Sequence, residues 1–184
     1  MKLLKLSILL FLTVFISCSG EDESNTPSGT YLTINGDTRE IINNSGDSEL
    51  RITKEILSNP SWFNNISGNF KVINLDIYDP NKSLIANFGD YNYGSYLILR
   101  FVLPTNFSVG TYTTIGWSNN SSPLGNNESF SEFLALTEFV KNIKAGQTYE
   151  IKEDGNKWIV EFNNLEFEGD GNTAKISGRI ILNK

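Results

Sequence analysis

The segment that points most clearly to a buried strand reads Tyr96-Leu97-Ile98-Leu99-Arg100-Phe101-Val102-Leu103. Its residues are apolar at odd and even positions alike, and Arg100 is the one charged interruption. Because successive side chains of a strand point to opposite faces of a sheet, such a run is typical of a strand that is packed on both faces. We therefore predict a central strand over residues 96–103, between two packed layers.

Shorter alternating runs lie on both sides of this strand, and Gly, Asn or Asp closes most of them. The turn Asn35-Gly36-Asp37 is a strong hairpin signal, and Asn163-Asn164 suggests a bulge. Roughly ten short strands with frequent turns predict an all-β fold, a single antiparallel β-sandwich or a flattened barrel. The other strands that we predict are 31–34, 50–52, 73–77, 84–88, 111–115, 149–152, 158–167 and 174–182.

Residues 130–144 allow two interpretations. Ser129 and Glu132 have the spacing of a capping box, and apolar residues from Phe133 to Ile143 recur at helical spacing, which favours one helix near 130–144. The apolar positions between Leu134 and Val140 also fit a strand with an irregularity.

The N-terminus has the three parts of an export signal. A positively charged start, Met1 to Lys5, precedes an apolar run from Leu6 to Ile16, which is too short for the roughly 20 residues of a membrane-spanning helix. Cys18 then follows a small residue. This arrangement resembles the lipobox of bacterial lipoproteins, and Phe15 at the usual Leu position fits the looser lipobox of Bacteroidota-type lipoproteins.

The resemblance implies a lipoprotein signal peptide at 1–17 and a Cys18 that carries fatty acids such as palmitate. The alternative is an ordinary secreted protein with a free Cys18. Residues 18–29 then form an acidic, flexible linker before a β-sandwich domain at 30–184. The triplet Glu21-Asp22-Glu23 resembles the signal that sends such lipoproteins to the outer face of the outer membrane. A periplasm-facing anchor is the alternative.

The domain itself resembles small, functionally uncharacterised surface lipoproteins of the Bacteroidota type. The resemblance implies a β-sandwich on a lipid anchor and carries no known activity. The matching pieces are Leu32-Thr33-Ile34-Asn35-Gly36, Gly110-Thr111-Tyr112, Phe162-Asn163-Asn164-Leu165-Glu166-Phe167 and Ile176-Ser177-Gly178-Arg179-Ile180.

The composition excludes several classes of function. The chain has 15 basic and 21 acidic residues, no histidine and one cysteine. Cleavage before Cys18 removes Lys2 and Lys5, which leaves 13 basic against 21 acidic residues and a net charge near −8. We therefore expect no nucleic-acid partner, since nucleic acid requires a basic surface. One cysteine allows no disulfide framework.

The same composition argues against catalysis. Without histidine there is no Ser-His-Asp constellation and no imidazole metal site, and acylation removes the only thiol. Glycine-rich phosphate loops are missing, so we predict no enzyme, no cofactor and no metal site. The turns 154–156 and 170–172 offer oxygens for calcium but do not match an EF-hand, and we expect plain turns there.

Glycoside hydrolysis stays open as an alternative, because it needs only two facing carboxylates. Acids at alternating strand positions are more often a solvated face. The acids that could take part are Asp76, Asp79, Asp90, Glu138, Glu161 and Glu166.

Aromatic residues in polar loops are the richest candidates for ligand binding. Trp62, Tyr91, Tyr93 and Trp117 each lie among Ser, Asn and Gly, and exposed rings stack on sugars while amides fix their orientation. The rings also suit a role as caps on the core. We predict a lipid-anchored, non-enzymatic binding or adhesion domain. A carbohydrate-binding accessory module and a structural partner of an outer-membrane complex, bound through an open sheet edge, are the alternatives.

Overall fold

The computed structural model describes residues 27–42, 48–63, 68–85, 87–90, 95–116, 123–135, 139–169 and 172–184, and at 90, 135, 139–141 and 172 the backbone alone. Within these ranges the chain forms one sheet of 11 strands. The strands are β1 (Tyr31–Ile34), β2 (Asp37–Glu40), β3 (Arg51–Ser58), β4 (Phe70–Tyr78), β5 (Tyr96–Pro104), β6 (Gly110–Thr114), β7 (Glu128–Ala135), β8 (Phe139–Ile143), β9 (Thr148–Asp154), β10 (Lys157–Gly169) and β11 (Asn172–Asn183). Two 3-10 helices, η2 (Ser61–Phe63) and η3 (Phe88–Asp90), lie between strands.

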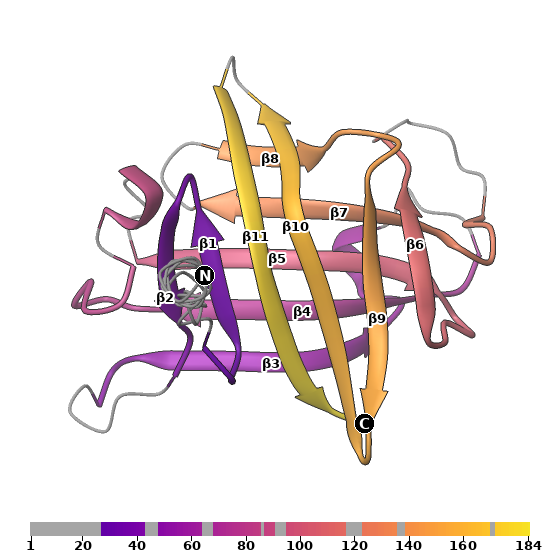
Figure 1. Cartoon of the computed structure of the whole chain (residues 1–184), viewed down its shortest axis with the longest axis horizontal. Helices are drawn as coiled ribbons and strands as arrows, with labels where there is room; N and C mark the ends of the chain where they lie inside the picture. Colours follow the sequence, from indigo (N-terminus) through magenta and orange to yellow (C-terminus); the bar gives the residue numbers. More distant parts are fainter. Residues whose placement is uncertain are drawn as a thin grey trace, which may run out of the picture.

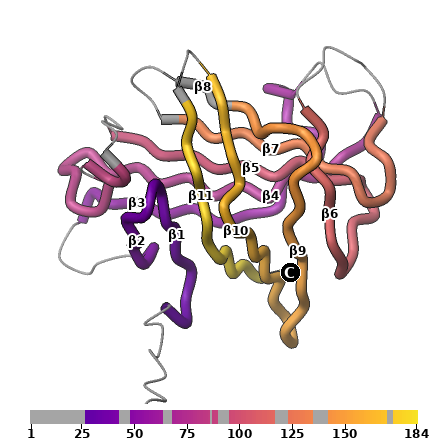
Figure 2. The backbone as a smooth tube through the Cα atoms, turned by 45° about the horizontal axis from the view of Figure 1, so that its top comes forward, coloured from indigo at the N-terminus to yellow at the C-terminus, as the bar shows by residue number. Residues whose placement is uncertain are grey.

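The sheet folds over into two layers whose strands cross (Figure 1). The strand order is β2-β1-β11-β10-β9-β6-β7-β5-β4-β3, and β8 pairs with both β10 and β7. We call β2, β1, β11, β10, β9 and β6 the front layer, and β3, β4, β5, β7 and β8 the back layer. Figure 2 shows β10 and β11 passing over β5, β4 and β3. The all-β sandwich or flattened barrel predicted from the sequence is confirmed.

The predicted central strand is β5, which pairs with β4 on one side and β7 on the other. On its inner face, Phe101 meets the rings of Tyr149 and Phe162 from the front layer, at 4.8 and 5.2 Å between centroids. On its outer face, Val102 is fully buried beside Phe130, which packs against the η2 ring of Phe63. Apolar residues at every position therefore reflect cover on both faces.

Turn chemistry in the front layer also follows the sequence. Asn35 and Gly36 adopt positive φ angles of 49° and 91° between β1 and β2, as an Asn-Gly hairpin requires. The predicted bulge interrupts the pairing of β10 with β11 between Phe162 and Leu165. Gly178 pairs with Phe162, and a Cβ there would lie 2.6 Å from the carbonyl oxygen of Tyr31. Glycine thus allows β1 to approach β11 closely.

Three expectations about secondary structure are wrong. In place of the predicted helix near 130–144, the described residues of that range form β7 and β8, which pair as antiparallel strands because each has a neighbour in the sheet that supplies its backbone hydrogen bonds. The described residues of the predicted strand 84–88, which are 84, 85, 87 and 88, form turns and the start of η3. The sheet is also not purely antiparallel, since β6 and β7 run parallel.

The turn at 79–85 has a local cause. Asp79 is fully buried, and its carboxylate accepts hydrogen bonds from the backbone N–H groups of Ser83, Leu84 and Ile85 at 2.7 to 2.9 Å. A carboxylate that collects several amides holds the chain in a turn and offers the backbone an alternative to a strand ladder.

Candidate ligand-binding surfaces

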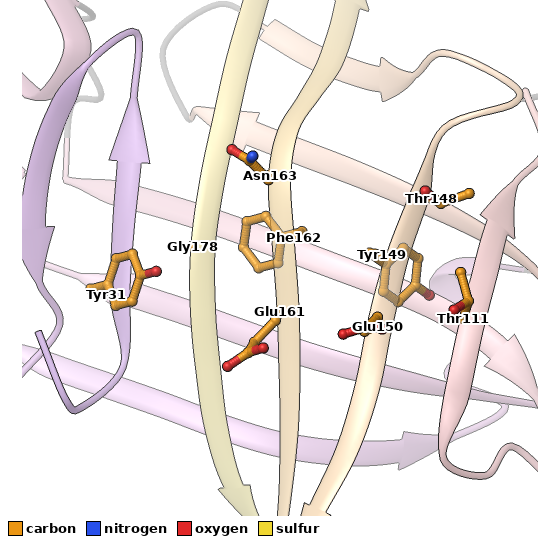
Figure 3. Close-up of a pocket in the computed structure, with 9 residues that line it drawn as sticks. All are labelled: Tyr31, Thr111, Thr148, Tyr149, Glu150, Glu161, Phe162, Asn163 and Gly178. Atoms are coloured by element: carbon orange, nitrogen blue, oxygen red, sulfur yellow. The ribbon is translucent and has the colours of Figure 1, made fainter. Parts of the chain in front are cut away.

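A groove with a volume of about 650 Å³ lies on the outer surface of the front layer (Figure 3). Tyr31 and Thr111 stand near its two ends, with Glu161 and Glu150 between them. The residues that line it are Tyr31, Thr111, Thr148, Tyr149, Glu150, Glu161, Phe162, Asn163 and Gly178. Tyr149, Phe162 and Gly178 are buried and form its floor.

The register of five strands creates this groove. Cross-strand pairs align one row of outward side chains across β1, β11, β10, β9 and β6. The row consists of Tyr31, Arg179, Glu161, Glu150 and Thr111. An aromatic ring, three charges and a hydroxyl thus come together from positions that are up to 148 residues apart in the sequence.

The charges of the row are linked to one another. Lys152 Nζ donates to Glu161 Oε2 at 2.5 Å and lies 3.0 Å from Glu150 Oε2, while Arg179 Nη2 lies 2.8 Å from Glu161 Oε1. The hydrogen bond from Lys152, together with the charge of Arg179, lowers the pKa of Glu161 despite partial burial. The carboxylate is therefore ionised at neutral pH and is held in one place.

The spacing of Glu150 and Glu161 bears on glycoside hydrolysis. Because Lys152 Nζ lies 3.0 Å from Glu150 Oε2 and 2.5 Å from Glu161 Oε2, these two oxygens are no more than 5.5 Å apart, which is closer than the two acids of an inverting glycosidase. A glycosidase also needs a carboxylic acid that keeps its proton at neutral pH. Lys152 has the opposite effect on Glu161, since it lowers the pKa. This pair is suited to accept hydrogen bonds from a ligand.

The other acids proposed from the sequence lie elsewhere. The carboxylate of Asp79 accepts backbone hydrogen bonds within the turn at 79–85. Glu166 pairs with Lys144 Nζ at 2.7 Å, and this hydrogen bond lowers its pKa. Asp76 lies on the back layer, where burial raises its pKa against the nearby charge of Arg100. Glu138 and the side chain of Asp90 fall outside the described residues.

Of the four aromatic candidates, Trp62 alone lies within the described residues, and Tyr91, Tyr93 and Trp117 lie outside them. The predicted lipidation site Cys18 also lies outside the described residues. The Trp62 side chain in η2 is 52% exposed, and the Arg100 guanidinium carbon lies 5.0 Å from the ring centroid. Arg100 in turn donates to Glu132 Oε1 at 2.5 Å and to Asn74 Oδ1 at 3.2 Å. Trp62 and the groove lie on opposite outer surfaces of the two-layered fold.

Sequence reasoning missed the groove. Tyr31, Glu150 and Thr111 occupy ordinary alternating positions of predicted strands, and no local motif marks them. The signal that could have found them is the pairing of strands far apart in sequence, which a single sequence does not display. The predicted plain turn at 154–156 is present, with Gly155 at a positive φ of 56°.

Among the residues that the structure describes, no three acidic, histidine or cysteine side chains gather in an arrangement that could hold a metal ion. The same part of the chain contains no helix with the length and apolar character needed to cross a membrane. In comparisons with known proteins, the chain matches no protein-family model, no curated protein and no solved structure.

Proposed function

We propose that this chain is a lipid-anchored protein of the cell envelope whose β-sandwich is a non-enzymatic, carbohydrate-binding domain. The observation that carries the proposal is the groove of the front layer, where an aromatic ring lies in one row with charged and hydroxyl side chains. The fold supports the proposal, because a two-layered β-fold presents this polar groove on the outer surface of its front layer.

The chemistry of the groove favours a sugar over an apolar ligand. A sugar presents hydroxyl groups at its edge and C–H groups on its face, so it needs hydrogen-bond partners beside a ring that it can stack on. Glu161 and Glu150 supply acceptors, Asn163 supplies both a donor and an acceptor, and Tyr31 supplies the ring. Lys152 and Arg179 fix Glu161 before a ligand arrives, which reduces the entropy lost on binding.

The proposed anchor lies close to the groove in the chain. Tyr31 follows Cys18 by 13 residues, a tether that reaches at most about 45 Å when fully extended. A lipidated Cys18 therefore holds a glycan in the groove within that distance of the outer membrane. We propose the cell surface as the location and the periplasmic face as its alternative. Protease treatment of intact cells distinguishes the two, since a surface domain is digested.

The binding proposal is tested on a glycan array with the full chain in detergent. We expect a hit for the wild type and about a tenfold loss of affinity in Tyr31→Ala, the effect of losing roughly 1 to 1.5 kcal/mol of ring stacking. Val109→Ala is the control, because Val109 is 54% exposed and does not line the groove. An array without any hit, or equal binding by Tyr31→Ala, contradicts the proposal.

The anchor has a separate test. Radiolabelled palmitate fed to cells should label the wild-type chain and fail to label Cys18→Ser. Labelling of both chains, or of neither, contradicts the anchor but leaves the binding proposal standing, because the groove does not involve Cys18.

A second candidate is an assembly partner that binds through a sheet edge. Among the described strands, β3 ends the sheet and pairs with β4 alone. Arg51, Lys54 and Glu55 place charges along this edge, the kind of residue that discourages added strands. This candidate therefore ranks below carbohydrate binding. Affinity capture from envelope extracts that is lost on substituting Ile56 by Pro in β3 would favour it.

A further inference from the structure

A polar row crosses the outer surface of the back layer, where the neighbouring row is apolar. Glu55, Asn74, Arg100 and Glu132 stand opposite one another on β3, β4, β5 and β7. The next row toward η2 includes Val72, Val102 and Phe130, which are all buried, and Phe130 packs against Phe63. The polar row thus borders a buried apolar row on its η2 side.

Hydrogen bonds hold this row rigid. Arg100 donates to Glu132 and Asn74, and Asn74 Nδ2 donates to Glu55 Oε1 at 3.4 Å. The side chains of Arg100 and Glu132 are only 15% and 11% exposed. An arginine with two fixed partners presents its planar guanidinium group in one orientation.

Stability alone does not account for a buried ion pair here. Well-packed apolar residues of similar volume are often as stable as a buried pair, because they avoid the cost of removing two charges from water. Apolar side chains already fill the adjacent row. What the ion pair adds is a fixed cation under the ring of Trp62, which lies 5.0 Å from Arg100 and is 52% exposed.

We propose that Trp62, positioned by Arg100 and Glu132, is a second ligand platform that stacks on a neutral sugar ring. Arg100 already occupies one face of the indole, so a cationic ligand on the other face would meet a ring that faces a positive charge. Glu55 and Asp76 lie near Arg100 and disfavour an anion. A neutral ring with apolar C–H groups on its face and hydroxyl groups at its edge satisfies both constraints.

This inference extends the proposed function to a second surface, and it shares the ligand class with that function but none of its residues. The groove and Trp62 lie on the outer surfaces of opposite layers. One domain could then hold two segments of a polysaccharide, or two chains, and gain affinity from having both sites occupied. Short oligosaccharides that fill one site should not show this gain.

The experiment is affinity electrophoresis of the full chain in detergent, through native gels that contain starch, mannan, xylan or β-1,3-glucan. We expect at least one polysaccharide to retard the wild type, with an affinity that falls tenfold or more in Trp62→Ala and is largely kept in Trp62→Tyr. Trp158→Phe is the matched control, since Trp158 also has a cation over its ring, Lys184 Nζ at 4.9 Å, but packs against Phe107.

The outcomes separate the two surfaces. Retardation that is lost in Trp62→Ala but unchanged in Tyr31→Ala supports the platform and contradicts the groove, whereas the reverse overturns the platform alone. A wild type that no gel retards, or a Trp158→Phe variant as weak as Trp62→Ala, also overturns the platform. Because Trp62 is half-exposed, we expect its replacement to leave folding intact, and circular dichroism of each variant checks this.

The role of Arg100 has its own readout. In the double variant Arg100→Met with Glu132→Leu, apolar side chains of similar size replace the ion pair and the ring loses its cation. We expect polysaccharide affinity to fall at least threefold, and the indole emission assigned to Trp62 by difference from Trp62→Phe to shift. Unchanged affinity and emission would show that Arg100 does not position the ring.

Discussion

The two outer surfaces of the molecule carry the same ion pair in different surroundings. On the back layer, Arg100 of β5 stands opposite Glu132 of β7, and on the front layer Arg179 of β11 stands opposite Glu161 of β10. The back pair is 15% and 11% exposed and lies near η2, while the front pair is 31% and 29% exposed and borders an open groove. The two pairs have the same residue types and the same cross-strand placement, so their degree of burial determines how much each contributes to stability.

Cover sets the free energy of each pair. An exposed ion pair contributes at most about 1 kcal/mol, because water solvates both charges whether or not they meet. In a buried pair, each charge has already lost its water and depends on its partner. The front pair therefore contributes little to stability, whereas removing one partner of the back pair leaves the other charge buried without compensation.

The largest effect that we predict is the loss of the buried acid. Glu132→Ala leaves the guanidinium of Arg100 without its charged acceptor, and we expect unfolding free energy to fall by about 3 to 5 kcal/mol. Urea denaturation followed by far-ultraviolet circular dichroism measures this fall. Glu132→Gln keeps an acceptor for Arg100 and should lose less. A fall of less than about 1 kcal/mol in Glu132→Ala would show that the Arg100–Glu132 pair contributes no more to stability than the Arg179–Glu161 pair.

A change of intermediate size concerns the floor of the groove. Gly178→Ala introduces a Cβ 2.6 Å from the Tyr31 carbonyl oxygen and 3.0 Å from the ring of Phe162. Because the first contact is with backbone, β1 must move away from β11. We expect a loss of about 1 to 3 kcal/mol in urea denaturation, and weaker glycan binding as Tyr31 moves. Lys175→Ala, an exposed change on the same strand, is the control and should cost about 0.5 kcal/mol or less.

The sequence predicts the fold through local signals. Positive φ angles at Asn35 and Gly36, and the bulge after Phe162, follow from turn chemistry that acts within a few residues. The apolar run of β5 identifies a strand covered on both faces. These features need no knowledge of which strands pair, and they were predicted correctly.

Non-local pairing explains what could not be predicted. Ser129 and Glu132 have the spacing of a helix cap, yet Glu132 bonds to Arg100, 32 residues earlier, and β7 is a strand because β5 pairs with it. The groove likewise depends on Tyr31 meeting Arg179. Arg100 is visible in the sequence as an interruption, but its partners are visible only in the fold. The polar loop around Trp62 marks this residue as a candidate, but its position over Arg100 could not be predicted from the sequence.

The smallest effect that we predict distinguishes the two pairs by pH. The pKa of Glu161 is lowered, chiefly by Lys152, so the folded state binds fewer protons than the unfolded state between the two pKa values. Its contribution is therefore fully present above pH 4.5, the ordinary glutamate value, and is lost as the pH falls through the folded-state pKa. Burial raises the pKa of Glu132 against the effect of Arg100, so that acid titrates in the opposite sense and favours the fold below pH 4.5.

Glu161→Gln removes the charge that pairs with both Arg179 and Lys152. We expect it to cost at most about 1 kcal/mol at pH 7, and the cost should shrink as the pH falls below 4.5 and through the folded-state pKa of Glu161. Urea denaturation at half-unit steps of pH measures the difference, and high salt should shrink it, because ions screen exposed charges. A cost above about 2 kcal/mol that salt does not change would show that the fold depends on Glu161 as it depends on Glu132. Glu161 would then have a structural role, which contradicts its assignment to ligand binding.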